Sequence, residues 1–463
     1  MTISGKIADY ATKLRFEDLP PEVVFKTKRC LLDTLGCSIG GYCSEVGRII
    51  RGLVGELDGP EEASVIGSGM RTSCLNATLA NGVMLRYLDY LDVYRNPTGA
   101  APMKTGVHSC EVIPAALAVG EWEHCSGKEV ITAIVLGYEL SDLFIDAVVG
   151  SAILDRGWNI DSRGAYIVPV VAGRLLGLSK DQIESAIGIS GSHNMVLGIL
   201  DAAGEENTMT KNLRFPFTAY GGIMAALMAR RGITGPSRVM EGHEGFIQAV
   251  LDGAFEPDIL TGVGERFTIL DTTVKSFAAD AHTLGHITAT LDLVKEHDIK
   301  PEDVEHVNVK VGTRCMGHCG DPVKRYPTNK ETADHSCYYL TAIAIIDRAV
   351  GPDQYTPEKL KDSKVRELID KVTLEVEPSL DQLVKAYPGI VEIQTKQGDK
   401  YKCRVDYPRG HPLNPMTDQE IEAKFRSMAS KLMSEGQMMK VIDTSNNFEK
   451  LDDISQLMKL LVF

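Results

Sequence analysis

Residues 88–92 read Leu88-Asp89-Tyr90-Leu91-Asp92, and residues 107–118 read Val107-His108-Ser109-Cys110-Glu111-Val112-Ile113-Pro114-Ala115-Ala116-Leu117-Ala118. The loop between them, from Arg95 to Gly106, contains Asn96-Pro97-Thr98-Gly99, which cannot continue a helix. The stretch therefore predicts two helical segments joined by a loop, with two carboxylates and one imidazole close to the junction. Acid–base groups on a loop that rigid helices hold in place are a common way to build a catalytic site.

The N-terminal part of the chain has the apolar spacing of helices. Pro20-Pro21 opens one helix, and the segments 112–122 and 130–149 continue the pattern. Ser179-Lys180-Asp181-Gln182 is a capping box that predicts a helix start, and a further helix is expected over 223–231, ending at Gly232. Residues 1–267 are therefore predicted to form a large all-helical domain.

The pattern changes to alternation after about residue 267. Valines at 307, 309 and 311 alternate with polar residues, as do the apolar residues of 372–376, which is typical of half-buried strands. The segments 391–395 and 401–405 flank Gln397-Gly398-Asp399 and predict a β-hairpin. Helices are expected over 282–297, over 339–348 and after Thr356. Residues 268–407 are therefore predicted to form a smaller α+β domain.

The last part of the chain returns to helical patterns. Tyr407 to Pro415 is rich in proline and reads as a linker, and Thr417-Asp418-Gln419-Glu420 is a second capping box. Residues 408–463 are expected to be helices that pack back on the first domain. The predicted fold class is mainly α, with a large helical domain and a smaller α+β lid domain.

Composition excludes several classes of function. The chain has 463 residues and a net charge of −14, which argues against nucleic acid or an anionic membrane as the main partner. It has no apolar run long enough to span a membrane and no signal-peptide pattern at its N-terminus. Its ten cysteines are scattered along the sequence, as in a chain with reduced thiols. We expect a cytoplasmic protein.

The chain lacks the glycine-rich motifs that bind dinucleotides or phosphates, and it lacks a nucleophile elbow. Its only close cysteine pair is Cys315-Met316-Gly317-His318-Cys319, and a second pair of metal ligands at suitable spacing is missing. We interpret this segment as a loop after the strand at 307–311 and expect no metal. Acid–base chemistry without a cofactor remains as the simplest interpretation.

Several motifs, taken together and in order, resemble those of the MmgE/PrpD family. They are Leu31-Leu32-Asp33-Thr34-Leu35-Gly36, Asn81-Gly82, Leu88-Asp89-Tyr90, His108-Ser109, Gly173-Arg174-Leu175-Leu176-Gly177-Leu178, Met209-Thr210-Lys211-Asn212-Leu213, Gly232-Ile233-Thr234-Gly235-Pro236 and Glu241-Gly242-His243-Glu244-Gly245-Phe246. Members of this family include 2-methylcitrate dehydratase, cis-aconitate decarboxylase and iminodisuccinate epimerase. The resemblance implies a helical domain with an α+β lid, a homodimer, an active site in the cleft between the domains, and no metal or organic cofactor.

The resemblance also implies roles for the first acidic motif and for the histidine after it. Asp89 matches the first aspartate of the family's acidic motif, and Asp92 approximates a later one. Three residues apart, the two are expected on one helix face. A solvated helix end is the alternative for Asp92. His108 matches a family histidine, and either His108 or Asp89 could act as the base. Val93 stands where the family has threonine, so one hydroxyl contact is lost.

The cationic positions of the family are partly kept. Lys211 and Lys275 match family lysines, which could hold a substrate carboxylate or stabilise an enediolate. Arg214 and Asn159 stand where the family commonly has histidine. Asn159 could bind substrate but could not move a proton, and a simple loop asparagine is the alternative.

The second half of the chain departs further from the family pattern. Phe277-Ala278-Ala279-Asp280 replaces a conserved segment, and His282 or His286 could take the place of a family histidine by a small shift in register. A helix-start or core histidine is the alternative for each. Tyr339 matches a family tyrosine whose phenol would donate to a substrate carboxylate, with core packing as the alternative. We predict Asp89, His108, Lys211, Lys275 and Tyr339 as catalytic, and Asp92, Asn159, Arg214 and His282 as substrate-binding.

These residues predict a lyase that acts on a small di- or tricarboxylate without a cofactor. A base would take the proton α to a carboxylate, and preorganised cations would stabilise the charge that develops there. Dehydration is the first expectation, by analogy with the family. Decarboxylation, epimerisation, and a non-catalytic homologue that binds carboxylates are the alternatives.

Overall fold

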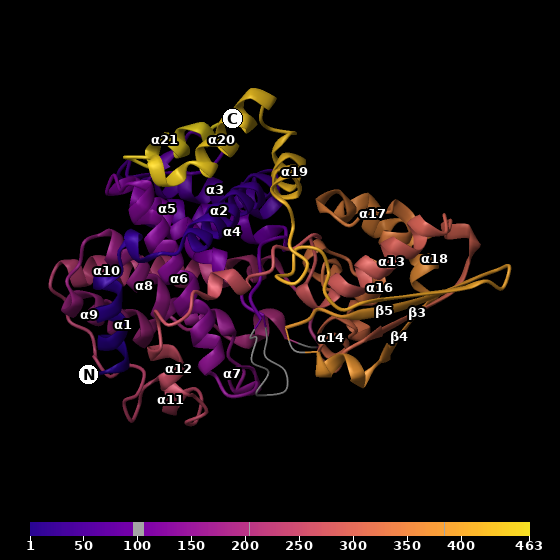
Figure 1. The fold of residues 1–463 in the computed structure, drawn as a ribbon, viewed down its shortest axis with the longest axis horizontal. Coiled ribbons are helices and arrows are strands. Elements are labelled where there is room, and N and C mark those ends of the chain that lie inside the picture. Colours follow the sequence, from indigo (N-terminus) through magenta and orange to yellow (C-terminus); the bar gives the residue numbers. More distant parts are fainter. Residues whose placement is uncertain (96–105, 203, 384) are drawn as a thin grey trace.

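The computed structural model describes residues 1–95, 106–202, 204–383 and 385–463. The proline- and glycine-containing loop predicted at 96–99 lies outside the described residues. Helices dominate the described chain, as predicted, and Figure 1 shows two parts side by side. One part holds helices α1 to α12. The other part holds a four-stranded sheet with helices α13 to α18.

The N-terminal part is helical up to residue 261. Its helices are α1 (Ile3–Lys13), α2 (Pro21–Tyr42), α3 (Glu45–Leu57), α4 (Cys74–Tyr87), α5 (Ile113–Trp122), α6 (Gly127–Ala147), α7 (Ala152–Asp155), α8 (Gly164–Leu175), α9 (Lys180–His193), α10 (Arg214–Arg230), α11 (Phe246–Ala249) and α12 (Pro257–Thr261). The short strands β1 (Ala63–Ser64) and β2 (Arg71–Thr72) pair antiparallel. Helices α4, α5, α6 and α8 are almost wholly buried and form the centre of this part.

Two of the predicted helix starts, at Ser179 and at Thr417, are confirmed by their caps. The Ser179 side chain accepts from the backbone N–H of Gln182 at the start of α9, and Gln182 returns the contact. The predicted helix after residue 223 is longer than expected, because α10 begins at Arg214. Pro216 lies in its first turn, where the missing N–H of proline leaves no intrahelical bond unmade. Phe215, Pro216 and Phe217 therefore lie in the first turn of the helix and do not precede it.

The second part is built on a mixed sheet of strand order β4-β3-β5-β6. Its strands are β3 (Val304–Val311), β4 (Val372–Val376), β5 (Gly389–Thr395) and β6 (Lys400–Val405). Strands β3 and β4 run parallel, and β3–β5 and β5–β6 are antiparallel, so the predicted hairpin is confirmed. The helices are α13 (Leu284–Glu296), α14 (Thr313–Cys319), α15 (Lys330–Ala333), α16 (Cys337–Asp347), α17 (Pro357–Lys361) and α18 (Ser363–Ile369). Helix α13 packs on β5 and β6 and also against α16.

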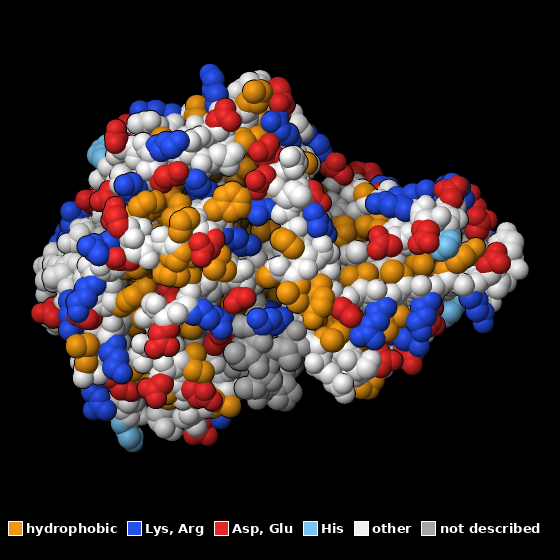
Figure 2. Space-filling model, viewed as in Figure 1, with side chains coloured by type: hydrophobic (Ala, Val, Ile, Leu, Met, Phe, Trp, Pro, Cys, Tyr) orange, Lys and Arg blue, Asp and Glu red, His pale blue; other side chains and the backbone are white. Residues whose placement is uncertain are grey.

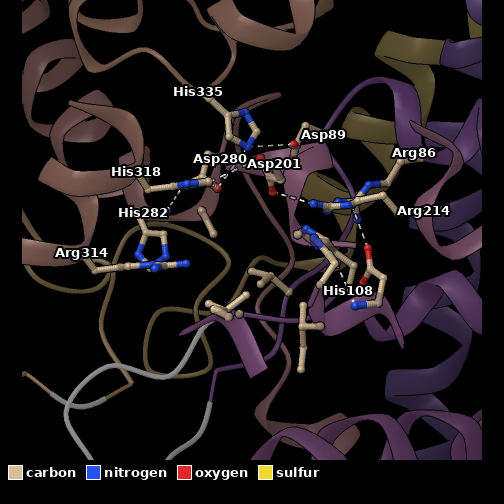
Figure 3. A pocket seen from close by; sticks show the side chains of 18 residues that line it. Arg86, Asp89, His108, Asp201, Arg214, Asp280, His282, Arg314, His318 and His335 are labelled. Carbon is tan, nitrogen blue, oxygen red and sulfur yellow. Dashed lines mark hydrogen bonds and ion pairs between the residues drawn. The ribbon is translucent and has the colours of Figure 1, made fainter. Parts of the chain in front are cut away.

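The prediction of a loop at 315–319 was wrong, because this segment lies in helix α14. The helix starts where the Asp381 carboxylate accepts from the Thr313 backbone N–H at 2.9 Å and from the Thr313 hydroxyl at 2.5 Å. A tertiary contact from a distant segment thus satisfies the first turn. Helix α14 carries Arg314 and His318 toward the first part of the molecule (Figure 3).

The C-terminal helices lie against the helical part. They are α19 (Asp418–Ala429), α20 (Glu435–Asn446) and α21 (Ser455–Met458), and Figure 1 shows them in yellow over α2 and its neighbours. Helix α19 starts at a capping box of Thr417 and Glu420 and packs against α2. The buried ammonium of Lys424 contacts the Asp33 carboxylate at 2.6 Å, which ties α19 to α2. The exact domain boundaries stay a prediction.

The surface carries no single-sign patch on the face shown in Figure 2, where acidic and basic side chains are interspersed. No helix in the described ranges has the length and apolarity needed to cross a membrane.

Candidate active site

A polar pocket lies where the helical part meets the lid part. The helical part contributes Arg86, Asp89, Val93, His108, Leu154, Asn159, Ile160, Asp161, Asp201 and Arg214 to its lining, and the lid part contributes Asp280, Ala281, His282, Arg314, His318 and His335. Figure 3 shows His335, His318, His282 and Arg314 on one side of this pocket and Arg86, Arg214 and His108 on the other. Ionisable side chains from distant segments therefore converge on one small space.

Asp89 lies just beyond the end of helix α4, in a backbone conformation that residues other than glycine rarely adopt. Its φ is +48°, and its N–H donates to the carbonyl of Arg86 at 3.1 Å. The prediction that Asp89 and Asp92 share a helix face was therefore wrong. The turn sends the Asp89 side chain toward the lid, whereas Asp92 points into the helical core and accepts from the Tyr138 hydroxyl at 2.6 Å.

Asp89 is the centre of a buried ion-pair cluster. Its Oδ2 accepts from Lys211 Nζ at 2.8 Å, and its Oδ1 accepts from Lys275 Nζ at 2.5 Å. Burial alone raises the pKa of this carboxyl, but the two ammonium groups outweigh burial and hold the pKa well below its usual range. Likewise, burial opposes the charge on Lys211, but Asp334 and Asp89 raise the pKa of this ammonium. Asp89 and Lys211 are therefore both charged at neutral pH.

His108 has a defined tautomer. Its Nδ1 lies 2.6 Å from the backbone carbonyl oxygen of Asp92, and a carbonyl can only accept. The proton must therefore be on Nδ1, which leaves the Nε2 lone pair open. Burial, with Arg86 and Lys275 nearby, holds the pKa of this imidazole well below its usual value. His108 is therefore a neutral imidazole at the pocket wall and can accept a proton.

His335 forms a second imidazole site that the sequence did not predict. Its Nδ1 lies 2.6 Å from Oδ1 of Asp334, and its Nε2 lies 3.7 Å from Asp89 and 3.5 Å from Asp280. A carboxylate behind an imidazole fixes the orientation of the ring. His335 therefore presents an oriented imidazole at the lid side of the pocket, opposite His108.

An alternating chain of charges forms the helical wall. Glu111 contacts Arg86 at 3.0 Å and Arg163 at 3.0 Å, and Arg163 also pairs with Asp161. Arg214 then contacts Asp161 at 2.9 Å and Asp201 at 2.5 Å. Because each guanidinium in this chain already has carboxylate partners, the wall is close to neutral.

The structure brings some of the predicted residues to the pocket and not others. Asp89, His108, Asn159, Arg214 and His282 line it. Lys211 and Lys275 do not line it but contact Asp89 from behind.

Tyr339 and Asp92 lie elsewhere. The Tyr339 hydroxyl donates to the carbonyl of Gln354 at 2.5 Å, in the core of the lid part, which is the core-packing alternative. Asp92, which is 1% exposed, is likewise held in the core and is not a solvated helix end.

The positions that depart from the family motifs gather in the pocket. Val93, Asn159, Arg214 and Asp280 all line it. The Asn159 Oδ1 accepts from the Asp161 N–H at 2.9 Å, and no hydrogen bond occupies its amide nitrogen within the described ranges. Arg214 is paired with two carboxylates and is therefore less open to substrate than predicted.

Four lid residues in the lining were missed by sequence reasoning: Asp280, Arg314, His318 and His335. His318 was seen only as part of a cysteine motif, and Asp280 and His335 only as parts of altered family segments. Arg314 gave no signal, because nothing in its neighbourhood predicts that α14 faces the pocket. Their grouping depends on how the lid packs on the helical part.

Side chains that can ligate a metal also meet here. One atom each from Asp201, His318 and His335 lies within 4.8 Å of the others, and so do atoms of Asp280, His318 and Cys319. The same groups are ion-paired with one another, with His318 Nε2 3.8 Å from Asp201 and 3.9 Å from Asp280. The prediction of a metal-free, cofactor-free site stays a prediction.

Two family models match this chain. The MmgE/PrpD N-terminal domain matches residues 5–258, and the MmgE/PrpD C-terminal domain matches residues 277–449.

Similar curated proteins match along almost their whole length. Cis-aconitate decarboxylase of Aspergillus terreus is 25% identical, with 99% of this chain and 96% of the relative covered. The human cis-aconitate decarboxylase is also 25% identical, with 99% of this chain and 94% of the relative covered. The mitochondrial 2-methylcitrate dehydratase of Yarrowia lipolytica is 23% identical, with 98% and 89% covered.

Proposed function

Since the chain belongs to the MmgE/PrpD family, we propose that it is a lyase that removes water from a small di- or tricarboxylate, starting with loss of the proton α to a carboxylate. One observation carries the proposal: His108 presents an unprotonated Nε2 at the wall of the pocket where both parts of the molecule meet. A neutral imidazole held in one tautomer is suited to take a proton from carbon at neutral pH.

His108 is a better base than Asp89, the other candidate. The Asp89 carboxylate accepts from two ammonium groups, and its pKa lies well below the usual range, so it holds protons weakly. We assign Asp89 the role of a positioning residue that keeps Lys211 and Lys275 in place. The two ammonium groups place positive charge behind this wall, where it offsets the negative charge of an enediolate.

Dehydration also requires a proton for the leaving group. His108 takes the α proton, the electron pair forms the carbon–carbon double bond, and the carbon–oxygen bond breaks. The departing hydroxide needs one proton to leave as water. His335, held by Asp334 on the lid side, is the candidate donor, since it faces His108 from the other part of the molecule. These steps need no cofactor.

Decarboxylation is the second candidate, because the similar proteins include several named cis-aconitate decarboxylases. In that reaction a carbon–carbon bond breaks and CO2 leaves. The electron pair of the broken bond forms a new carbon–carbon double bond, and the electron pair of the original double bond takes a proton at its far carbon. The protonated form of His108 or His335 would supply that proton. The same cations serve both reactions, whereas the unprotonated state of His108 favours proton abstraction.

The experiment is proton NMR in D2O with citrate, 2-methylcitrate, cis-aconitate and iminodisuccinate. A vinyl product from a hydroxy acid supports dehydration, and itaconate from cis-aconitate supports decarboxylation. Loss of a C–H signal without a new product would indicate epimerisation. The variant His108→Gln should lose the activity, whereas His243→Gln, which changes an exposed histidine outside the pocket, should keep it. A folded protein with no turnover on any substrate contradicts the proposal.

A homodimer and a cytoplasmic location remain part of the proposal as well. Both are implied by the family resemblance and composition. Sedimentation of the purified chain, at concentrations from nanomolar to micromolar, tests the first. A monomer at micromolar concentration would contradict it.

A further inference from the structure

Arg314 is a cation of the pocket lining that has no ion-pair partner within the described ranges. It lies in the first turn of α14 and lines the pocket from the lid side. Its Nε is buried and makes no hydrogen bond, and no ion pair within the described ranges involves its guanidinium. Arg86 and Arg214, on the opposite wall, each contact a carboxylate at 3.0 Å or less. The Nε of Arg314 is therefore a buried donor whose hydrogen-bonding capacity is unused.

A second guanidinium, that of Arg95, lies near enough to Arg314 for the two charges to interact. Arg95 donates to the carbonyl of Ala386 at 2.5 Å and lies 5.4 Å from the centre of the Tyr387 ring, but it has no carboxylate partner within the described ranges. Burial, and then the positive charge of Arg314, lowers the pKa of this group. The nearby acid, Asp381, accepts from the backbone N–H and hydroxyl of Thr313. Two like charges therefore interact here, and no carboxylate pairs with either of them in the part of the chain that the structure describes.

Two imidazoles complete this end of the pocket. His282 and His318 line it, and burial holds the pKa of both well below the usual value, with Arg314 contributing in each case. Figure 3 shows His282 beside Arg314, and His318 above them, on the side away from His108. Neutral imidazoles can donate one N–H each to a bound anion. The lid side thus offers N–H donors and net positive charge.

This arrangement is costly without an anion. Like charges repel, and an unmade hydrogen bond of a buried polar atom carries a further penalty. A carboxylate removes both costs, because a guanidinium can bind its two oxygens with two parallel N–H bonds. Within the described ranges, neither Arg95 nor Arg314 is paired with a protein carboxylate.

We infer that Arg314, with Arg95 nearby and His282 and His318 beside it, forms a subsite for the carboxylate of the substrate that is remote from the reacting carbon. The identification of this anion as part of the substrate rests on the proposed function. The subsite requires a ligand with at least two carboxylates, one near His108 and one at Arg314. A monocarboxylate leaves Arg314 unpaired.

The test compares ligands that differ by one carboxylate and cannot react. Glutarate is butyrate with one further carboxylate on its terminal methyl carbon, and propane-1,2,3-tricarboxylate carries a third. Their dissociation constants are measured by isothermal titration calorimetry with the full chain. The variants are Arg314→Gln and the milder Arg314→Lys. Arg366→Gln is the control, because Arg366 is an exposed lid arginine outside the pocket and its loss changes the net charge equally.

We expect glutarate and the tricarboxylate to bind about 10- to 100-fold more weakly to Arg314→Gln, and butyrate to bind equally well to both proteins. Arg314→Lys should give an intermediate loss, and Arg366→Gln should match the unaltered protein. Equal losses for butyrate and glutarate, or no loss for either, overturn the subsite. Tighter binding of inorganic phosphate than of glutarate, lost in Arg314→Gln, overturns its assignment to a carboxylate.

Binding and turnover separate the two proposals. If these ligands bind as expected while no substrate in the NMR panel is converted, the subsite stands and the proposed lyase activity fails. If turnover is observed while Arg314→Gln leaves the advantage of glutarate over butyrate unchanged, the activity stands and the subsite fails.

Discussion

Replacing Asp89 by asparagine tests the ion-pair cluster under the pocket. The carboxylate accepts from Lys211 at 2.8 Å and from Lys275 at 2.5 Å, and the three residues are 3%, 2% and 0% exposed. Removing one partner of a buried ion pair costs about 3–5 kcal/mol, because the remaining charge stays buried. Lys275 keeps the carbonyls of Asp89 and Ala279, and Lys211 keeps Asp334 at 3.6 Å. We therefore expect the cost of one pair, about 3–5 kcal/mol.

Urea unfolding followed by tryptophan fluorescence measures this loss, since both tryptophans, Trp122 and Trp158, lie in the helical part that carries Asp89. The effect should depend on pH in one direction. The pKa of Asp89 in the folded protein is depressed, so its contribution is present above about pH 4 and is lost as the pH falls through the folded pKa. The difference between Asp89→Asn and the unaltered protein should therefore be constant from pH 6 to 8 and shrink below about pH 4.

Two further variants make the test specific. Asp452→Asn changes an exposed aspartate and should alter the free energy of unfolding by less than about 0.5 kcal/mol. Asp89→Asn combined with Lys211→Met removes both charges of one pair, so the double variant should lose less than the sum of the single variants. A loss below about 1 kcal/mol for Asp89→Asn, or strict additivity in the double variant, would refute the buried cluster as we describe it.

Three other variants test the site and the lid. His108→Gln should lower kcat by about 10²- to 10⁴-fold. Because burial depresses the pKa of His108, kcat/KM of the unaltered protein should stay flat from pH 8 to below 6.5. A decline that begins above pH 6.5 argues against His108 as the base. Gly285→Ala places a Cβ 2.2 Å from the carbonyl of Tyr387 and should destabilise the lid by about 1–3 kcal/mol in thermal unfolding; an unchanged melting temperature contradicts that contact. Asn159→His removes the cap on the Asp161 N–H, at a cost of about 1 kcal/mol, and adds an ionisable group to the pocket. It should add a pKa to the pH–rate profile, and an unchanged profile would place residue 159 away from the reacting atoms.

Features set by neighbours in the sequence were predicted well. The capping boxes at Ser179 and Thr417 satisfy helix N–H groups within three residues, so the sequence contains all the information needed to place these helix starts. The β-hairpin was equally local, because β5 and β6 are joined by a short turn. The change from helical to alternating patterns located the lid sheet for the same reason.

Features set by distant contacts were not predicted. Helix α14 is capped by Asp381, 68 residues away, so its own sequence read as a loop. The left-handed conformation of Asp89 ended α4 before the acidic pair, and the two carboxylates diverged. Arg314 and His335 carry no distinctive pattern of their own. Motif matching did bring Asp89, Lys211 and Lys275 together, but it did not show that the lysines face the carboxylate and not the cavity.

The Asp89 cluster has a consequence for the order in which the chain is made. Lys275 and His335 follow Asp89 by 186 and 246 positions, so a ribosome exposes the N-terminal helices long before these partners emerge. Until then Asp89 remains hydrated, and the wall that it forms has no opposite side. A chain cut short before residue 275 holds Asp89 without Lys275, and one cut short before residue 335 lacks the lid side of the pocket. The cluster and the pocket are therefore completed only when both parts of the chain are present.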